Sequence, residues 1–386
     1  MATELRVGVI GCGNISTAYF TLAPLFRGLK ITACADMNMG SANAQAEKFG
    51  LKAMSVDDLL ASKDIDVVVN LTIPAAHYPI TKAILESGKH AYSEKPLVLT
   101  IEEGLELRRI ADAKGLKAGC APDTFLGGAH QQARKAIDDG LIGTITSGTA
   151  HVMNFGMEHW HPNPEFFYAP GGGPVLDLGP YYVANLINLI GPVKRVGALT
   201  STPQKARTIA NGPRLGETVP VLTPTTVHAL LEFHSGATVT LSSSWDVFAH
   251  RHGNMELYGS EGSLYVPDPN FFGGEVLATK RNGPAEALPA WDHALGIPNQ
   301  DHPQGKMANY RTAGLADMAI GIAEGRDYRC SLERTLHGVD VMTAALRSGE
   351  IGEFITLQTT CTQPAYLGPE EAKALLRWLE KGSAIR

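Results

Sequence analysis

The stretch Leu5-Arg-Val-Gly-Val-Ile10-Gly11-Cys-Gly13-Asn-Ile-Ser16 decides the fold. Its first half is an apolar run typical of a buried strand, and its second half is a G-x-G turn that opens a predicted helix. In a dinucleotide-binding fold the first glycine makes the tight turn, and the second lets backbone N–H groups approach a pyrophosphate. Ser16 replaces the usual third glycine and is still small. We therefore expect Gly11, Gly13, Asn14 and Ile15 to bind a dinucleotide, although a lone G-x-G also fits an ordinary strand-to-helix turn.

Asp36 is the second signal of a dinucleotide site. It ends the next predicted strand, about 20 residues after the loop, where an acid accepts hydrogen bonds from the adenosine ribose. A 2′-phosphate about 5 Å from its carboxylate would cost roughly 3 kcal/mol per unit charge, about a hundredfold in affinity. Met37 and Asn38 add no arginine that could offset this repulsion. The sequence predicts NAD as the cofactor in preference to NADP.

The first 120 residues alternate short apolar runs with amphipathic stretches, a pattern that favours βαβ units and a parallel sheet. We predict a doubly wound α/β sheet of six strands, five of which can be placed. The strands are expected at Leu5–Ile10, Ile31–Ala35, Val67–Leu71, His90–Tyr92 and Lys117–Cys120, and the helices near 15–27, 40–49, 76–87 and 101–114. Gly50, Gly88 and Gly115 follow three of these helices, at the position where a left-handed residue ends a helix.

The pattern changes after about residue 125, which predicts a second domain. A helix near 128–138 is followed by a strand from about Thr144 and by a proline- and aromatic-rich loop over 159–173. Further helices are expected at 177–190, 307–324, 331–348 and 368–381, and strands at Val227–Phe233, Ala237–Ser243, Asn254–Tyr258 and Ser263–Val266. We predict a Rossmann domain over 1–123 and an α+β domain with an open, mostly antiparallel sheet over 124–386, whose final helices can pack back on the first domain.

Composition narrows the class of protein. The chain has 386 residues, 33 basic and 39 acidic, with a formal net charge of −6, which argues against nucleic acid or an anionic membrane as the partner. No apolar run approaches the 18 or so residues of a membrane span. Five scattered cysteines form no C-x-x-C pair, and the N-terminal residues pass directly into a strand without a secretory signal pattern. We expect a cytoplasmic protein.

Several later motifs carry a resemblance to a known family. They are Val69-Asn-Leu-Thr-Ile-Pro74-Ala-Ala-His77, Gly88-Lys-His-Ala-Tyr-Ser-Glu94-Lys95-Pro96, Gly171-Gly-Gly-Pro-Val-Leu-Asp177-Leu-Gly179 and Tyr258-Gly-Ser-Glu-Gly262. With the Gly11 turn, they make the chain resemble the Gfo/Idh/MocA family of NAD(P)-dependent oxidoreductases over most of its length. The resemblance implies a Rossmann domain, a second domain that covers the substrate, and a homodimer or homotetramer formed through the second sheet.

The resemblance also implies roles for single residues. Lys95 would lie beside the nicotinamide and bind the substrate oxygen, with a solvated surface lysine as the alternative. Asp177 would contact substrate hydroxyls, or cap the helix that follows it, or do both. Glu94, Pro74 and His77 match positions near the cofactor, although His77 also fits a hydrogen-bonded histidine at the start of a helix.

Tyr181 departs from the family pattern. Members typically carry a histidine four residues after the aspartate as general acid/base, and the i,i+4 spacing keeps Tyr181 on the helix face of Asp177. A tyrosine donates a proton readily at neutral pH but accepts one only with a depressed pKa. The hypothesis is that Tyr181 exchanges the proton while Lys95 holds the oxyanion and stabilises the phenolate. The segment Ala121-Pro-Asp-Thr-Phe125 also lacks the arginine that relatives often carry there, which leaves an arginine clamp for an anionic group in doubt.

Two H-x-H pairs, His159/His161 and His250/His252, are geometrically compatible with a metal, but no third ligand can be assigned and we expect no metal site. His159, Trp160 and His161 are instead predicted to line the substrate pocket.

The function expected is NAD-dependent hydride transfer between nicotinamide and a secondary alcohol or ketone of a sugar, glycoside or cyclitol. A non-catalytic dinucleotide-binding regulator and a reductase of a non-sugar substrate remain alternatives. The sugar, the carbon that reacts, the direction of reaction and the number of subunits are not readable from the residues.

Overall fold

The computed structural model describes residues 4–377 except 282 and 304. Residues 5–120 contain a six-stranded sheet in the order β3-β2-β1-β4-β5-β6, in which every pair is parallel. Its strands are β1 (Leu5–Ile10), β2 (Leu29–Ala35), β3 (Lys52–Met54), β4 (Val67–Asn70), β5 (His90–Ser93) and β6 (Ala118–Cys120). This order confirms the doubly wound sheet and puts its topological switch point between β1 and β4.

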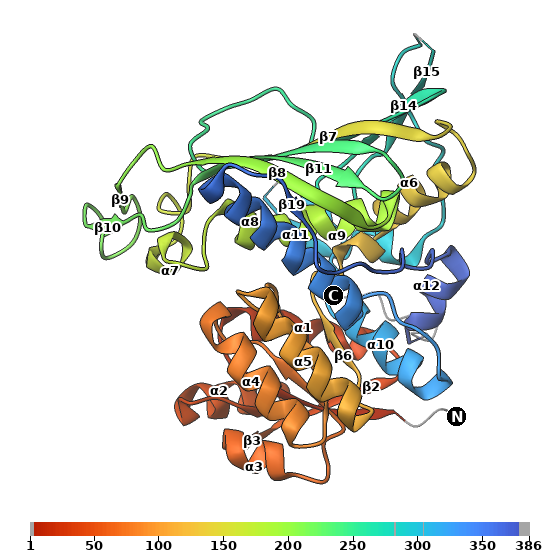
Figure 1. Ribbon diagram of the computed structural model, residues 1–386. Coiled ribbons are helices and arrows are strands. Elements are labelled where there is room, and N and C mark those ends of the chain that lie inside the picture. Colours follow the sequence, from red (N-terminus) through yellow and green to blue (C-terminus); the bar gives the residue numbers. More distant parts are fainter. Residues whose placement is uncertain (1–3, 282, 304, 378–386) are drawn as a thin grey trace.

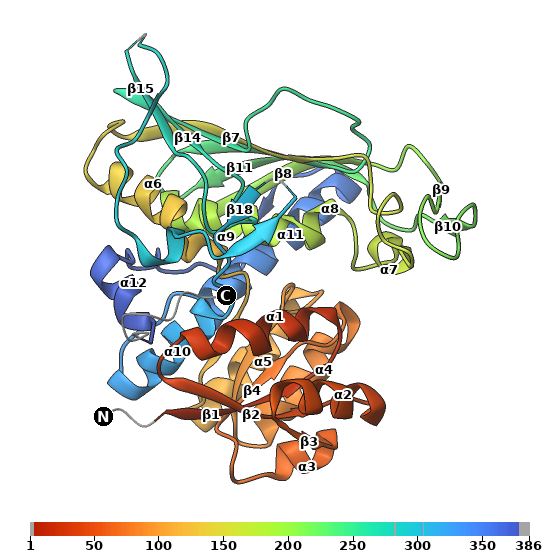
Figure 2. The same ribbon diagram turned by 180° about the vertical axis from the view of Figure 1, so that it is seen from behind.

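Helices cover both faces of this sheet. They are α1 (Asn14–Leu22), α2 (Met39–Phe49), α3 (Val56–Ala61), α4 (Pro74–Glu86) and α5 (Ile101–Lys114), with a 3₁₀ turn η1 at Ala23–Leu25. Figure 1 shows α4 and α5 in front of the sheet, and the reverse view in Figure 2 shows α1 and α2 in front. The helices end as predicted at left-handed Gly50 and Gly115. Strand β3 and helix α3, both short, were not predicted.

The second sheet has nine strands in the order β16-β15-β14-β13-β7-β12-β11-β8-β19, and only the β7–β12 pair is parallel. Its strands are β7 (Ile145–Met153), β8 (Val193–Ser201), β11 (Thr226–Phe233), β12 (Thr238–Ser244), β13 (Met255–Gly259), β14 (Gly262–Val266), β15 (Leu277–Lys280), β16 (Glu286–Ala287) and β19 (Ile355–Thr356). Two small hairpins add β9 (Ala206–Thr208) with β10 (Thr218–Pro220), and β17 (Gln300–His302) with β18 (Gly305–Met307). The open, mostly antiparallel sheet is confirmed.

One face of this sheet carries helices and the other is open (Figure 1). The covering helices are α6 (Gly128–Asp138), α8 (Pro174–Asp177), α9 (Gly179–Ile190) and α11 (Leu332–Ile351), and they lie between the second sheet and the Rossmann sheet. The other helical segments are η2 (Thr124–Leu126), α7 (Glu165–Tyr168), η3 (Ala294–Gly296), α10 (Ala313–Glu324) and α12 (Pro369–Leu375). The side of the second domain that faces the Rossmann sheet is therefore a helical layer.

Five predicted segments differ from the structure. The helix expected near 15–27 ends at Leu22 and is followed by the 3₁₀ turn η1. The loop over 159–173 contains the short helix α7, and the helix expected from 307 begins at Ala313. The final helix ends at Leu375, and residues 378–381 of that prediction lie outside the described residues. The helix expected over 177–190 is two helices separated at Leu178, because Pro180 has no N–H to donate and starts a new helix in the first turn of α9.

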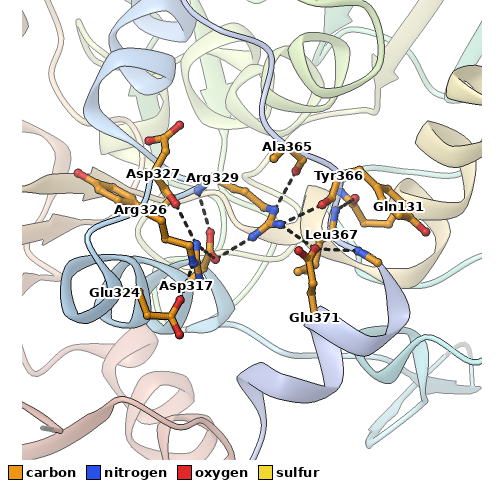
Figure 3. A network of polar contacts seen from close by, with 12 residues as sticks. Gln131, Asp317, Glu324, Arg326, Asp327, Arg329, Ala365, Tyr366, Leu367 and Glu371 are labelled. Carbon is orange, nitrogen blue, oxygen red and sulfur yellow. Dashed lines mark hydrogen bonds and ion pairs between the residues drawn. The ribbon is translucent and has the colours of Figure 1, made fainter. Parts of the chain in front are cut away.

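The C-terminal segment is tied to both halves of the molecule (Figure 3). Buried Asp317 on α10 accepts hydrogen bonds from the backbone and side chain of Arg329, at 2.7 and 2.8 Å. The Arg329 guanidinium also donates to the carbonyls of Ala365 and Tyr366. Leu367 then donates to Gln131 of α6, and a β-bridge joins Leu376 to Phe26 of the first domain. Within the described residues, no helix is long and apolar enough to cross a membrane.

Candidate active site

The glycine turn is built as a phosphate-binding loop requires. Gly11 has φ +103°, and a Cβ there would lie 2.6 Å from the backbone carbonyl of Leu71, so only glycine fits. Gly13 differs, because a Cβ on it would meet no atom within 4 Å. Its outer side is open space beside the N-terminus of α1, where free backbone N–H groups and the helix dipole favour an anion. The turn therefore fits a dinucleotide pyrophosphate.

Asp36 lies beside this turn. Its Oδ2 accepts a hydrogen bond from the N–H of Cys12 at 2.8 Å, and its Oδ1 accepts one from Asn38 at 2.8 Å. Each carboxylate oxygen keeps a second acceptor position, which leaves room for ribose hydroxyls. The side chains of Met37 and Ile73 are 98% and 68% exposed at the ends of β2 and β4. These two exposed apolar side chains lie at the carboxyl ends of the strands, where they suit contact with a flat aromatic ring such as adenine. The periodicity of the sequence did not predict them.

Lys95 and Asp177 meet across the two domains. Lys95 follows β5, Asp177 ends α8, and the Lys95 Nζ donates to Asp177 Oδ1 at 2.9 Å and to its backbone oxygen at 2.7 Å. Both side chains are largely buried. Burial opposes the charge of the ammonium, but the charges of Asp177 and Tyr181 outweigh it and raise the pKa of Lys95 above its ordinary value. Lys95 is thus a protonated donor with one N–H left for a ligand.

Tyr181 completes this group from the first turn of α9. The Lys95 Nζ lies 5.3 Å from the centroid of its ring. Its hydroxyl makes no hydrogen bond with the residues that the structure describes, although the side chain is only 5% exposed. Asp177 and Tyr181 thus both lie close to the Lys95 ammonium, although the break between α8 and α9 at Leu178 separates them. The alternative role of Asp177 as the helix cap is wrong, because Leu178 is the N-cap of α9 and no side chain caps it.

Glu94 and His77 support the segment that carries Lys95. Glu94 accepts hydrogen bonds from the Tyr19 hydroxyl and from the Lys95 N–H, both at 3.0 Å. The buried His77 ring contacts the carbonyls of Pro96 at 2.5 Å and Thr72 at 2.9 Å, and burial lowers its pKa. These contacts hold the turn before Pro74 against the Glu-Lys-Pro segment. The roles of Pro74 and His77 toward the cofactor stay predictions.

His159, Trp160 and His161 lie in the aromatic segment before α7. Trp160 is 58% exposed, and the His161 ring packs edge-on against Trp160, Phe166 and Phe167. Within the described residues, no hydrogen bond or ring contact joins these three residues to Lys95 or Tyr181. Their role as the wall of the substrate pocket stays a prediction. His250 and His252 stack near His151 instead, and no group of three His, Cys, Asp or Glu suited to a metal occurs in the described part of the chain.

Arg311 is a charged residue of this region that sequence reasoning missed. It directly precedes Thr312, whose N–H donates to Asp123 Oδ2 at 2.9 Å, and Asp123 follows β6. The charge of Tyr181, followed by that of Glu94, raises the pKa of Arg311 despite its burial. The turn at Thr312 thus brings Arg311, from a position almost 190 residues later along the chain, near the segment after β6, which has no arginine of its own. Nothing in the local sequence pattern around 311 identifies it.

These features define a dinucleotide-binding domain. Beyond the carboxyl ends of its strands, Lys95 meets Asp177 and Tyr181 of the second domain, an arrangement typical of a catalytic site. Family models agree with this description. Residues 5–121 match the "Oxidoreductase family, NAD-binding Rossmann fold" model of Gfo/Idh/MocA proteins, and residues 130–265 match the "GFO/IDH/MocA C-terminal domain" model. The chain belongs to the Gfo/Idh/MocA family, and its first domain is an NAD-binding Rossmann domain.

Curated relatives match the chain over different shares of their length. An uncharacterised oxidoreductase of Schizosaccharomyces pombe is 31% identical over 146 residues, which is 37% of this chain and 38% of the relative. The D-glucoside 3-dehydrogenase of Escherichia coli is 29% identical over 255 residues, which is 63% of this chain and 71% of that protein. The chain thus spans well under half of the first relative and more than two thirds of the second.

Solved structures share the fold over nearly the whole chain. An NAD-binding oxidoreductase from Klebsiella pneumoniae aligns with a TM-score of 0.78 at 23% identity, covering 92% of this chain and 99% of that one. Levoglucosan dehydrogenase in complex with NADH aligns with a TM-score of 0.77 at 22% identity, covering 92% and 100%. At these identities the likeness establishes the two-domain architecture.

Proposed function

We propose that this protein is an NAD-dependent oxidoreductase that interconverts a secondary alcohol and a ketone on a sugar, glycoside or cyclitol. The observation that carries the proposal is the meeting of Lys95, Asp177 and Tyr181 from two domains. Relatives described as a D-glucoside 3-dehydrogenase, a 1,5-anhydro-D-fructose reductase and a D-xylose dehydrogenase support the carbohydrate class.

NAD, when bound along the glycine turn, would supply the hydride chemistry. The chain's own residues would manage the proton. The raised pKa of Lys95 keeps its ammonium protonated at neutral pH, so Lys95 can donate its remaining N–H to the substrate oxygen but is unsuited to accept a proton. Asp177 fixes the ammonium and offers its second carboxylate oxygen to a substrate hydroxyl.

Tyr181 is the group proposed to exchange the proton. In reduction its hydroxyl would donate to the carbonyl oxygen as the ketone becomes an alcohol, and the nearby Lys95 ammonium would stabilise the phenolate that remains. In oxidation the proton moves the other way. His159, Trp160 and His161 are proposed to present aromatic and imidazole surface to the sugar ring.

A screen of sugars, glycosides and cyclitols, followed through the absorbance of NADH at 340 nm, tests the proposal. We expect turnover of at least one compound class, loss of turnover in Lys95→Met, and a kcat lower by roughly 10²–10⁴ in Tyr181→Phe. Tyr182→Phe is the matched control, because the Tyr182 hydroxyl contacts Asp268 and Asn254 instead. It removes the same oxygen one position along, and its kcat should stay near wild type.

Other outcomes separate the alternatives. Binding of NAD without turnover across the whole panel would favour a non-catalytic dinucleotide-binding regulator. Turnover confined to non-sugar ketones would favour a reductase of a non-sugar substrate. If Tyr181→Phe keeps a normal kcat while Lys95→Met abolishes activity, Tyr181 is a wall of the pocket and lysine acts alone.

We further propose a homodimer or homotetramer formed through the open face of the second sheet. Leu199, Leu230 and Phe354 are 75%, 53% and 55% exposed around a groove of about 550 Å³ on that face. Contiguous exposed apolar surface of this kind is typical of a protein interface. A cytoplasmic location is proposed as well, and it is supported by five cysteines that are all buried free thiols.

A further inference from the structure

The guanidinium of Arg311 stands out among the arginines of the interior. Arg134, Arg329 and Arg334 each donate several hydrogen bonds to carbonyls or carboxylates. The side chain of Arg311 is partly buried, yet it makes no hydrogen bond or ion pair with any residue that the structure describes. Removing a guanidinium from water without a partner is costly, so an arginine kept this way is available for a ligand.

The backbone that presents Arg311 is strained. Thr312 has φ +91°, a left-handed conformation that β-branched residues rarely adopt. Asp123 stabilises this turn, because its Oδ2 accepts the N–H groups of Thr312 at 2.9 Å and of Gly314 at 3.0 Å. Strain of this kind is concentrated at binding and catalytic sites, where surrounding contacts fix a geometry that the chain alone would not adopt.

Arg311 opens onto a cavity of about 180 Å³ that is lined by residues between 124 and 311. Thr124, Asn270 and Gln300 also line it, and they supply a hydroxyl and two amides. Thr124 is 2% exposed, and its Oγ1 has no hydrogen-bond partner among the described residues. A cavity lined by an unpaired cation and by two amide side chains is a preformed polar site, far larger than the roughly 10–15 Å³ that one water needs.

Arg311 lies within electrostatic reach of the proposed reaction centre. Tyr181 is the group whose charge acts most strongly on Arg311. The two acids nearby are already engaged, since Glu94 accepts from Tyr19 and the Lys95 N–H, while Asp123 accepts from the strained turn. Arg311 is therefore not neutralised by direct contact with either acid.

We propose that Arg311 and Thr124 form a subsite for a carboxylate on the substrate, so that the preferred substrates are acidic sugars such as uronic or aldonic acids. The planar guanidinium donates two parallel hydrogen bonds to a carboxylate, and one cation matches a monoanion. The buried hydroxyl of Thr124 has no other partner among the described residues, so a small rotation of this side chain would supply a third donor. The proposal rests on the proposed oxidoreductase function and names its substrate class.

The test uses sugar pairs that differ only by a carboxylate in place of CH₂OH, such as methyl glucosides and galactosides with their uronides. For each pair, kcat/KM with NAD is measured for wild type, Arg311→Met, Arg311→Lys and Thr124→Val. Lys306→Met is the matched control, because it removes an exposed cation from β18 near the same cavity. Binding of each uronide to the enzyme–NADH complex is measured by calorimetry as a readout independent of turnover.

We expect wild type to prefer the acid in at least one pair, and Arg311→Met to reduce the acid-to-neutral ratio and the uronide affinity roughly 100-fold. Arg311→Lys should recover part of this loss, Thr124→Val should lose several-fold, and Lys306→Met should change neither quantity. Uronide binding that is absent in wild type, or equal in wild type and Arg311→Met, overturns the subsite. If neutral sugars still turn over in that case, the oxidoreductase function stands. Arginine-dependent uronide binding without any turnover would support the subsite and contradict the oxidoreductase function.

Discussion

The carboxylate of Asp36 combines two tasks at one position. It accepts hydrogen bonds from the N–H of Cys12 in the glycine turn and from the N–H of Asn38, and its remaining acceptor positions are proposed to bind the ribose. Asp36→Asn replaces one acceptor oxygen by an NH₂ group that must face an N–H donor. We expect NAD to bind 10- to 100-fold more weakly, with a smaller loss for NADP because the repulsion of the 2′-phosphate is also removed. Fluorescence titration of both cofactors measures this change.

Asp57→Asn is the control for this prediction, since it makes the same change at an exposed acid in the first turn of α3. Its affinity for both cofactors should equal that of wild type. Equal affinities of the wild-type protein for NAD and NADP would refute the proposed preference for NAD.

Single residues were predictable where a motif fixes the backbone around them. Gly11, Asp36 and Lys95 each stand at the end of a parallel strand, and the carboxyl ends of such strands converge. Arg311 was not predictable, because its place beside Asp123 depends on a strained turn and on packing between segments far apart in sequence. Exposed Met37 and Ile73 were missed for a related reason, since a pattern of apolar residues indicates burial rather than a binding surface.

The aromatic segment before α7 depends on a buried ionic anchor. Arg207, in β9, forms an ion pair with Glu158 at 3.3 Å and a second one with Asp246. Tyr168 of α7 also donates a hydrogen bond to Glu158, next to His159. Arg207→Met would leave buried Glu158 without its cation, which should destabilise the protein by about 3–5 kcal/mol. We also expect KM to rise more than kcat falls, because the segment proposed to bind the sugar loses its support.

Arg214→Met tests the specificity of that effect. Arg214 lies in the same hairpin region and pairs with the more exposed Glu165 and Glu217, so its loss should cost at most about 1 kcal/mol. Urea denaturation and steady-state kinetics of both variants give the comparison. An Arg207→Met protein with unchanged KM would separate the aromatic segment from substrate binding.

Elements with strong periodicity were predicted well, and short ones were not. Strand β1 and helix α5 begin and end at the predicted residues, because an apolar run and a Thr100 capping box define them. The three-residue β3 and six-residue α3 carry too few residues for a period to be recognised. The break at Leu178 was readable in principle from Gly179-Pro180. The boundary between the domains at 123/124 stays a prediction.

We expect three buried histidines to make the molecule less stable in acid. His130 contacts the Phe271 carbonyl through Nε2 and the Asn185 amide through Nδ1, and His337 accepts the N–H of Val193, so both rings are held neutral. Burial lowers the pKa of His130, His293 and His337 to about 4 in each case. Because the unfolded chain binds these protons near pH 6.5 and the folded chain does not, stability falls as the pH drops from 6.5 to 4, by up to about 3 kcal/mol per histidine.

Asp123 acts in the opposite direction. Burial raises the pKa of its carboxyl to about 6, so the folded state keeps this proton between pH 6 and 4 and gains stability as the pH falls through that window. The net loss expected is therefore smaller than the sum for three histidines. Urea denaturation at pH 7, 6 and 5 should reveal the loss, and His337→Gln should flatten the slope while lowering stability at pH 7. A wild-type stability that is constant from pH 7 to 5 would contradict the assignment of neutral histidines.

We expect the open face of the second sheet to form the interface of the proposed homodimer or homotetramer. Leu230 lies on β11, where it pairs with Gly197 of β8, and the exposed Leu199 lies two residues further along β8, opposite His228. A charge at this position would have to be buried in an interface, so Leu230→Lys should dissociate the oligomer, whereas Leu215→Lys, in the turn between β9 and β10, should not. Sedimentation velocity of the three proteins is the measurement. A wild-type monomer at micromolar concentration would contradict the proposed oligomer. A Leu230→Lys protein of unchanged size would show that the interface lies elsewhere and that the groove around Leu199 has another role.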